Sequence, residues 1–357
     1  MHASLYQELD RLGVSQIVYS YFRKASGKRN EFDASNTVFV LRPILRQYHR
    51  ALYHLKVSRV FHDVCNTVEI SKVSISHATT LFSDGAIAYK LFNKYRIPYV
   101  VAVRSTDVDD FLRLAPHTWR MGRQVLLNAQ KVVFITESLK EKLLSHPFIC
   151  HDKDAVIQKT IVRPNGIPDY WLSDISCDIV HENNVLYIGS FLKRKNVLML
   201  EKAIVSLRKE PGFENIKLTL VGGGGGQARA VEQFARNNKE AIEYLGRIRD
   251  SDMLKQIYRR NSIFAMPSVN ETFGLVYLEA LSNNLAIIYT AGTGIDGFFD
   301  ASVGERIVQP TVQKLVAALK MILSHRDRYS NSSVDFNSFR WSRIADYYYG
   351  IYREIGR

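Results

Sequence analysis

Cysteine is scarce in this 357-residue sequence. The three cysteines, Cys65, Cys150 and Cys177, are widely spaced and form no CxxC pair. Such a set argues against a disulfide framework and a cysteine-ligated zinc site, and favours a reducing compartment. Long apolar runs are also missing, because none approaches the roughly 18–20 residues that span a bilayer. Residues 1–20 carry charges and lack the apolar core of a signal peptide. We therefore expect a cytoplasmic protein.

Acidic residues are sparse in the N-terminal half. Residues 1–166 contain 24 Lys and Arg against 14 Asp and Glu, a net charge of +10, whereas residues 167–357 contain 24 against 21, a net charge of +3. These sums account for the whole net charge of +13. The asymmetry indicates an anionic partner for the first half, which is acidic lipid, nucleic acid or an acidic substrate.

One segment concentrates this positive charge. PILRQYHRALYHLKVSR (43–59) predicts a helix with Pro43 at its first position. Its apolar stripe consists of Ile44, Leu45, Tyr48, Leu52 and Leu55. Its flanking cations, with no acid among them, are Arg42, Arg46, Arg50, Lys56 and Arg59. One interpretation is a helix on the anionic inner face of a membrane, with the protein peripheral there. The alternative is an ordinary surface helix that covers a sheet.

Strand and helix patterns alternate along the whole chain, which predicts α/β domains with doubly wound parallel sheets. Length favours two domains over one. The first Rossmann-like domain is expected at 1–166 and the second at 167–335, after a loose acidic linker. The aromatic helix in 336–357 is expected to return to the first domain. In such sheets, ligands bind at the carboxyl ends of strands.

Three polar residues follow predicted strands of the first domain. His77 is either a general base or a structural imidazole. Arg104 stands at the end of PYVVAVR (98–104), and Asp107 follows it. Asp107 either caps a helix or acts as an acceptor-side carboxylate.

The stretch FAMPSVNETFGLVYLEALSNNLAIIYT (264–290) predicts strand, loop, helix and strand. Glu271 lies on the loop and Glu279 about two helical turns later, so both can face one side. The backbone N–H groups of Phe273, Gly274 and Leu275 begin the helix and make an anion site. The alternative interpretation of the two glutamates is a solvated helix face.

Two further motifs follow strands of the second domain. The basic triplet KRK at 193–195 is a solvated loop or a neutraliser of pyrophosphate. The five glycines at 222–226 resemble a dinucleotide-binding turn, but Gln227 replaces the third glycine of GxGxxG. A turn that lets the backbone approach a ligand or a neighbouring domain is at least as good an interpretation.

NETFGLVYLEAL resembles the Glu-x7-Glu motif of retaining family-four glycosyltransferases of the GT-B fold, of the bacterial polysaccharide and glycolipid type. Agreement in order and spacing extends to RPNGI (163–167), YIGSFLKRKN (187–196), LTLVGGG (218–224), IEYLGRI (242–248) and FAMPS (264–268). The resemblance implies two Rossmann-like domains that face each other across a cleft. It is strong over 163–300 and weaker before.

The resemblance also implies roles. Glu271 would contact the donor sugar and Glu279 the ribose, while Lys195 would bind the diphosphate. Thr272, Phe273, Gly274 and Leu275 would offer backbone N–H groups. The catalytic candidates are Glu271, Lys195 and Asp107. Further donor-binding candidates are Arg194, Ser190, Ile248 and Asn165; the acceptor-side candidates are His77 and Arg104. The family works without a metal or a cofactor.

Three departures from the family pattern stand out. Ser190 replaces an arginine, so either Arg194 supplies that charge instead or donor binding is weaker. Arg104 replaces a histidine. The first strand and its glycine-rich loop are not recognisable, so we expect either that the chain is truncated there or that the acceptor domain is built differently.

The predicted function is therefore metal-independent, retaining transfer of a sugar from a nucleoside diphosphate, uridine favoured over guanosine, to a glycan or lipid-linked acceptor. The alternatives are a non-catalytic partner subunit of another transferase, or a sugar-nucleotide epimerase or phosphorylase. A basic nucleic-acid-binding module would give no reason for Glu271 and Glu279, and we expect no nucleic-acid partner.

Overall fold

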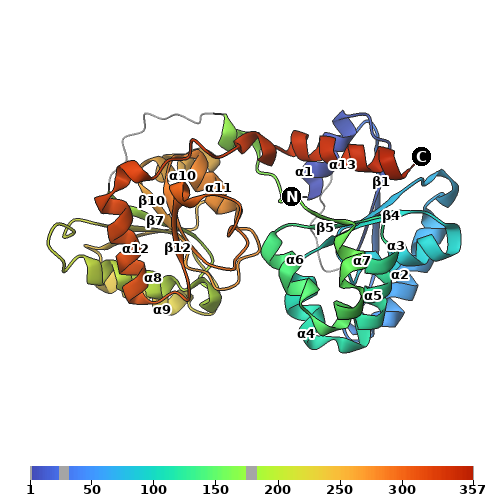
Figure 1. Ribbon diagram of the computed structural model, residues 1–357, viewed down its shortest axis with the longest axis horizontal. Coiled ribbons are helices and arrows are strands. Elements are labelled where there is room, and N and C mark those ends of the chain that lie inside the picture. Colours follow the sequence, from blue (N-terminus) through green and yellow to red (C-terminus); the bar gives the residue numbers. More distant parts are fainter. Residues whose placement is uncertain (1, 24–31, 174–182, 357) are drawn as a thin grey trace. The chain divides into compact units, whose positions relative to one another are not determined.

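A computed structural model describes residues 2–23, 32–173 and 183–356. The chain divides into two units, and Figure 1 shows the elements of each. Unit 1 comprises Met1–Gly166 and Ser338–Arg357, and unit 2 comprises Ile167–Asn337. Cys177 and most of the predicted linker lie outside the described residues. Within those residues, no helix has both the length and the apolar character that a membrane crossing requires.

Unit 1 contains two parallel sheets. A four-stranded sheet has the order β3-β4-β5-β6, formed by Ser76–Ala78, Tyr99–Val103, Lys131–Phe134 and Thr160–Val162. β1 (Gln16–Arg23) and β2 (Thr37–Leu45) pair only with each other among the described strands. Every residue of β4 is buried, as expected for a central parallel strand covered on both faces.

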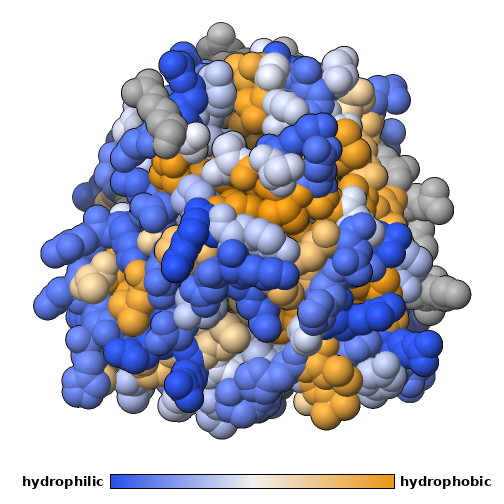
Figure 2. All heavy atoms as spheres, turned by 90° about the vertical axis from the view of Figure 1, so that its right-hand side faces the viewer, coloured by the Kyte–Doolittle hydropathy of each residue, from blue (hydrophilic) through white to orange (hydrophobic). Residues whose placement is uncertain are grey.

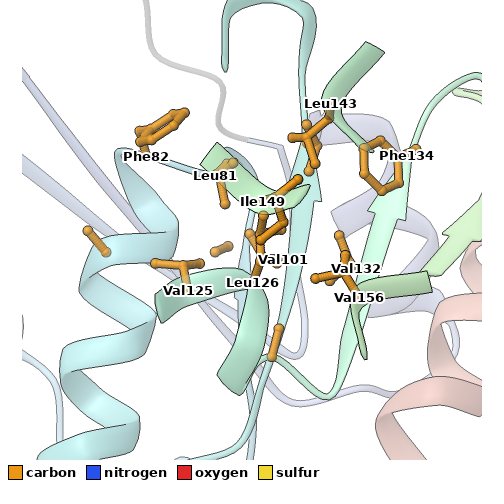
Figure 3. Close-up of a cluster of buried hydrophobic side chains, with 14 of the residues drawn as sticks. Leu81, Phe82, Val101, Val125, Leu126, Val132, Phe134, Leu143, Ile149 and Val156 are labelled. Carbon is orange, nitrogen blue, oxygen red and sulfur yellow. The ribbon is translucent and has the colours of Figure 1, made fainter. Parts of the chain in front are cut away.

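Helices cover both faces of the four-stranded sheet. They are α1 (His2–Arg11), α2 (Tyr53–Thr67), α3 (Asp84–Tyr95), α4 (Leu112–Leu114), α5 (Trp119–Asn128), α6 (Glu137–Leu144), α7 (Lys153–Ile157) and α13 (Trp341–Ile355). On one face, Val101 and Val132 pack against Leu126 of α5 and Leu143 of α6 (Figure 3). On the other face, Val100 packs with α1 and with the C-terminal helix α13.

The segment 43–59 was predicted as one helix, and that prediction is wrong. β2 continues through Pro43 to Leu45, a short 3₁₀ turn covers Gln47–Arg50, and α2 begins only at Tyr53. Proline is tolerated here because β2 pairs with β1 alone among the described strands, so its missing N–H breaks no second ladder. Ile44 and Leu45 pack in the core, whereas Tyr48, Leu52 and Leu55 are about half exposed.

The cations of that segment also differ in their environments. Arg42 forms a two-pronged ion pair with Asp63, with both N–O distances at 2.8 Å. Lys56 is half-buried and donates to Ser83 Oγ at 2.8 Å. Only Arg46, Arg50 and Arg59 are exposed. Asp63 therefore neutralises Arg42, whereas Lys56 keeps its charge and is only partly exposed.

Unit 2 contains one six-stranded parallel sheet in the order β12-β11-β10-β7-β8-β9. Its strands are β7 (Val185–Gly189), β8 (Leu218–Gly222), β9 (Ile242–Gly246), β10 (Ile263–Ala265), β11 (Ala286–Thr290) and β12 (Gly304–Ile307). Its helices are α8 (Val197–Leu207), α9 (Ala228–Asn237), α10 (Ser251–Arg259), α11 (Leu275–Ser282) and α12 (Val312–Ser324). In chain order this is the 3-2-1-4-5-6 arrangement of a Rossmann sheet, which reverses between β7 and β10.

Candidate active site

The carboxyl ends of β7 and β10 lie side by side at this reversal, and an ion pair joins the loops that follow them. Lys195, in the turn after β7, pairs with the carboxylate of Glu271, in the loop after β10. The Lys195 ammonium also lies 3.5 Å from the sulfur of Met266. The side chains are only 11% and 12% exposed, so each charge depends on the other for compensation. The two residues predicted to grip sugar and diphosphate therefore meet at one point.

Hydrogen bonds hold these two loops together. Asn196 donates its side-chain amide to the carbonyl of Pro267 at 2.8 Å, and Val269 donates its backbone N–H to the carbonyl of Arg194 at 2.9 Å. The exposed Arg194 guanidinium donates to the carbonyl of Asn270. Arg194 thus supports the loop that carries Glu271. The carbonyl of Ser190 accepts from the hydroxyl of Tyr187 at 2.9 Å.

The helix that begins after Glu271 is shaped by glycines. Gly274 precedes α11 with φ +78°, and a Cβ there would lie 2.7 Å from the Tyr277 ring. The Tyr277 hydroxyl donates to the carbonyl of Met266 at 2.7 Å, which joins the helix to β10. Gly294 packs so closely that a Cβ would lie 1.9 Å from the carbonyl of Thr272. The turn Thr272–Leu275 that was predicted to offer N–H groups is therefore set by backbone packing.

Glu279 has a different partner from Glu271. The Tyr258 hydroxyl of α10 donates to Glu279 Oε2 at 2.9 Å. Burial raises the pKa of Glu279, and the hydrogen bond from Tyr258 opposes that shift. The carboxylate is therefore oriented before any ligand arrives. Ile248, the predicted base contact, lies in the loop after β9 and is half-buried.

The glycines at 222–226 approach a neighbouring segment of unit 2. A Cβ on Gly222 would lie 1.8 Å from the carbonyl of Gly189, and one on Gly225 would lie 2.7 Å from that of Phe191. Backbone hydrogen bonds of 2.8 and 3.0 Å join Phe191 to Gly224 and Gln227. The close approach is therefore to a loop of the same unit, which neither interpretation had named.

The carboxylate of Asp107 in unit 1 accepts hydrogen bonds from backbone N–H groups. It is 1% exposed and accepts N–H groups from Leu81, Phe82 and Arg104 at 2.9–3.2 Å. Burial raises its pKa to about 6, although these hydrogen bonds oppose the shift. The geometry favours the capping alternative over contact with a substrate.

His77 and Arg104 are held by unit 1 itself. His77 Nδ1 hydrogen-bonds the Tyr352 hydroxyl of α13 at 2.5 Å, and its ring lies 5.0 Å from that of Tyr348. This partner supports the structural interpretation of His77. Arg104 donates to Asn165 Oδ1 at 3.3 Å, so Asn165, predicted on the donor side, contacts an acceptor-side candidate.

Sequence patterns missed four residues of this site. Tyr258 and Met266 contact the functional side chains directly, and Asn196 and Gly294 position the loops. Met266 and Asn196 lie inside the motifs FAMPS and YIGSFLKRKN, and Gly294 belongs to a glycine-rich turn after a strand, whereas Tyr258 left no signal. In the described ranges, no group of three or more His, Cys, Asp and Glu side chains is arranged to hold a metal ion.

Residues 179–334 match the family model of glycosyl transferases group 1. This segment is a group 1 glycosyltransferase domain. The chain is also similar to an uncharacterized glycosyltransferase of Methanocaldococcus jannaschii, at 23% identity over 92% of this chain and 88% of the relative.

Solved structures agree over nearly the whole chain. Sucrose-phosphate synthase from Thermosynechococcus elongatus has 18% identity and a TM-score of 0.71, covering 98% of this chain and 91% of that one. Anabaena HepE in complex with UDP-glucose has 15% identity and a TM-score of 0.64, covering 95% and 99%. These likenesses confirm the predicted GT-B fold.

Proposed function

We propose that this glycosyltransferase moves a hexose from a nucleoside-diphosphate sugar, with uridine favoured, to a glycan or lipid-linked acceptor, with retention of anomeric configuration and without a metal. The observation that carries the proposal is the buried Lys195–Glu271 pair at the switch point of the unit 2 sheet. The UDP-glucose held by the structurally similar Anabaena HepE supports the choice of donor.

Each group in unit 2 has chemistry that suits such a donor. Lys195, now neutralised by Glu271, would turn to the diphosphate, and Glu271 would accept hydrogen bonds from sugar hydroxyls. The first N–H groups of α11 have no partner within the helix and would favour the same anion. Glu279, oriented by Tyr258, would accept from the ribose hydroxyls.

In the proposed reaction, the bond from the anomeric carbon to the diphosphate oxygen breaks and the acceptor oxygen bonds to the same face. The acceptor proton passes to the departing phosphate. Negative charge grows on the leaving group, so Lys195 and the start of α11 would stabilise the transition state more than the ground state.

Transfer assays on the full chain test the proposal. Incubation with a panel of nucleotide sugars and acceptors should yield product only when a nucleoside-diphosphate sugar is present, with the anomeric configuration of the donor retained by NMR. Unchanged turnover in EDTA is the expected metal result. Inverted product would contradict retention, and a lack of binding to every nucleotide sugar would contradict the function.

We also propose that unit 1 binds the anionic inner face of the cell membrane, which would bring the enzyme to lipid-linked acceptors. Tyr48, Leu52 and Leu55 are 48–51% exposed, and the exposed Arg46 and Arg50 flank Tyr48. Figure 2 shows one face of the molecule coloured by hydropathy, on which hydrophobic areas lie among hydrophilic side chains. Exposed apolar groups beside arginines suit an anionic lipid surface.

Liposome flotation tests this second proposal. The protein should float with vesicles that contain anionic lipid and stay behind with neutral vesicles, and Leu52→Ser with Leu55→Ser should weaken flotation. Equal recovery with both kinds of vesicle would remove the proposal.

A further inference from the structure

The carboxyl edge of the four-stranded sheet in unit 1 gathers positive side chains on one face. Side chains alternate along a strand, and Val100 and Ala102 of β4 pack with α1 and α13. Arg104, two positions after Ala102, continues on that face. Ile161 of β6 also packs there, so Arg163 follows in the same way.

The charges of both guanidiniums influence the pKa of the same tyrosine, Tyr348. Burial raises the pKa of Tyr348 to about 12, and the charges of Arg104 and Arg163 both oppose that shift. Arg163 also stacks on Tyr347, with its guanidinium carbon 4.7 Å from the ring centroid. The two cations therefore lie in the loops after β4 and β6, which the Arg104–Asn165 hydrogen bond joins, and near the middle of α13.

Neither guanidinium forms an ion pair with a carboxylate in the described parts of the chain. Arg104 donates to the carbonyl of Thr79 at 3.1 Å and to Asn165 Oδ1 at 3.3 Å, both neutral acceptors. The Nε of Arg163 is buried and has no hydrogen-bond partner. Elsewhere in unit 1, Arg42 and Arg123 each hold a carboxylate. Two partly buried cations without a counter-charge are unusual and favour an anionic ligand.

The acids nearest this edge are already occupied. Asp84 accepts from the hydroxyls of Tyr21 at 2.7 Å and Thr79 at 2.6 Å. Asp107 accepts backbone N–H groups. Neither carboxylate pairs with the guanidinium of Arg104 or Arg163, since Asp107 accepts only the backbone N–H of Arg104.

We propose that Arg104 and Arg163 together bind a phosphate monoester on the acceptor substrate. This inference rests on the proposed glycosyl transfer and names the acceptor class. A guanidinium binds phosphate through paired N–H donors, and two of them match a dianionic group. The phosphate belongs either to a soluble sugar phosphate or to a lipid headgroup.

Isothermal titration of the full chain with three probes tests the inference. D-Glucose 6-phosphate represents the soluble source, monomeric dihexanoyl phosphatidic acid represents the lipid source, and D-glucose is the uncharged control. One of the two phosphate probes should bind and glucose should not. The probe that binds identifies the source. If neither phosphate probe binds, the inference is overturned.

Matched substitutions locate the binding. Arg104→Gln and Arg163→Gln should each weaken the phosphate probe by about tenfold or more, since each removes charge-assisted hydrogen bonds. Arg163→Lys, which keeps the charge but loses the fork, should weaken it less. Arg120→Gln removes an exposed arginine of α5 and should change nothing. Equal weakening by Arg120→Gln, or none by the other two, would contradict the inference.

UDP binding in the same samples separates this inference from the proposed function. UDP affinity should be the same in wild type, Arg104→Gln and Arg163→Gln, because Lys195 and Glu271 lie in unit 2. Phosphate binding without any UDP binding would leave the arginine site standing and sink the proposed transfer. UDP binding without arginine-dependent phosphate binding would do the reverse.

Discussion

The two units present opposite electrostatic arrangements at the carboxyl edges of their parallel sheets. In unit 2, Lys195 and Glu271 neutralise each other and are almost buried. In unit 1, Arg104 and Arg163 face neutral acceptors and an aromatic ring. Both edges are where an α/β sheet binds ligands. In unit 2, Lys195 and Glu271 pair with each other until a donor arrives, and would then bind its diphosphate and its sugar. In unit 1, the two arginines have no carboxylate among the described residues to exchange for an anionic ligand.

The largest effect should come from breaking the unit 2 pair at Glu271. Glu271→Ala should lower kcat by about 10²–10³-fold, because it removes the sugar contact and leaves Lys195 without its partner. Circular dichroism should show an intact fold. Glu240→Ala, at an exposed position of unit 2, is the control. If Glu271→Ala turned over like wild type, the carboxyl edge of the unit 2 sheet would not be the site of sugar transfer.

Removing the cation of the same pair should act mainly on binding. Lys195→Ala should lower the affinity for UDP by about 10–100-fold, the loss expected for a charge-assisted contact. Lys193→Ala changes an exposed lysine of the same triplet and should leave the affinity unchanged. Because Lys195 and Glu271 touch, the double substitution should reduce the free energy of UDP binding by less than the sum of the two single substitutions. Strict additivity would show that the pair does not act as a unit.

The close packing behind the unit 2 pair can be tested by adding a methyl group. Gly294→Ala should lower the free energy of unfolding by about 1–3 kcal/mol, because its Cβ would overlap the carbonyl of Thr272. Gly226→Ala is the control, since nothing lies within 4 Å of its added Cβ. Thermal unfolding measures both. Equal melting temperatures would mean that the turn adjusts and that its shape is not set by this contact.

A further comparison concerns two buried carboxyls, one in each unit. Asp107 has three backbone donors, whereas both oxygens of the fully buried Glu201 lack a hydrogen-bond partner. Burial raises the pKa of Glu201 to about 8 and that of Asp107 to about 6. Without N–H donors, nothing offsets the cost of charging Glu201.

The pH dependence follows from the sign of these shifts. Because the folded state holds the Glu201 proton more tightly than the unfolded state does, stability should fall as pH rises from about 4.5 to 8. The slope that Glu201 adds cannot exceed about 1.4 kcal/mol per pH unit. Glu201→Gln should flatten the profile measured by urea unfolding. A profile as steep as that of wild type would show that Glu201 is not the titrating group.

The hydrophobic periodicity of the sequence predicted most helices and strands. It failed where the same residues suit both a helix and a strand. The stretch 264–290 folds as predicted, with β10, α11 and β11 in order. At Pro43, the same residue suits a helix start and an edge strand, and only pairing with β1 decides between them. The apolar residues of 156–167 would suit a single strand, yet α7 takes Val156 and Ile157 and β6 spans only Thr160–Val162. Short apolar runs carry no reliable period.

The sequence by itself determined the α/β architecture, the resemblance to family-four glycosyltransferases and the identity of Lys195, Glu271 and Glu279 as candidates. Only the tertiary structure decided which charges meet. Lys195 and Glu271 are 76 positions apart and pair because strand order puts β10 beside β7. Arg42 finds Asp63, while Arg104 and Arg163 find no acid in the described chain. Local patterns report how a segment folds, but counter-charges come from segments that the fold brings together.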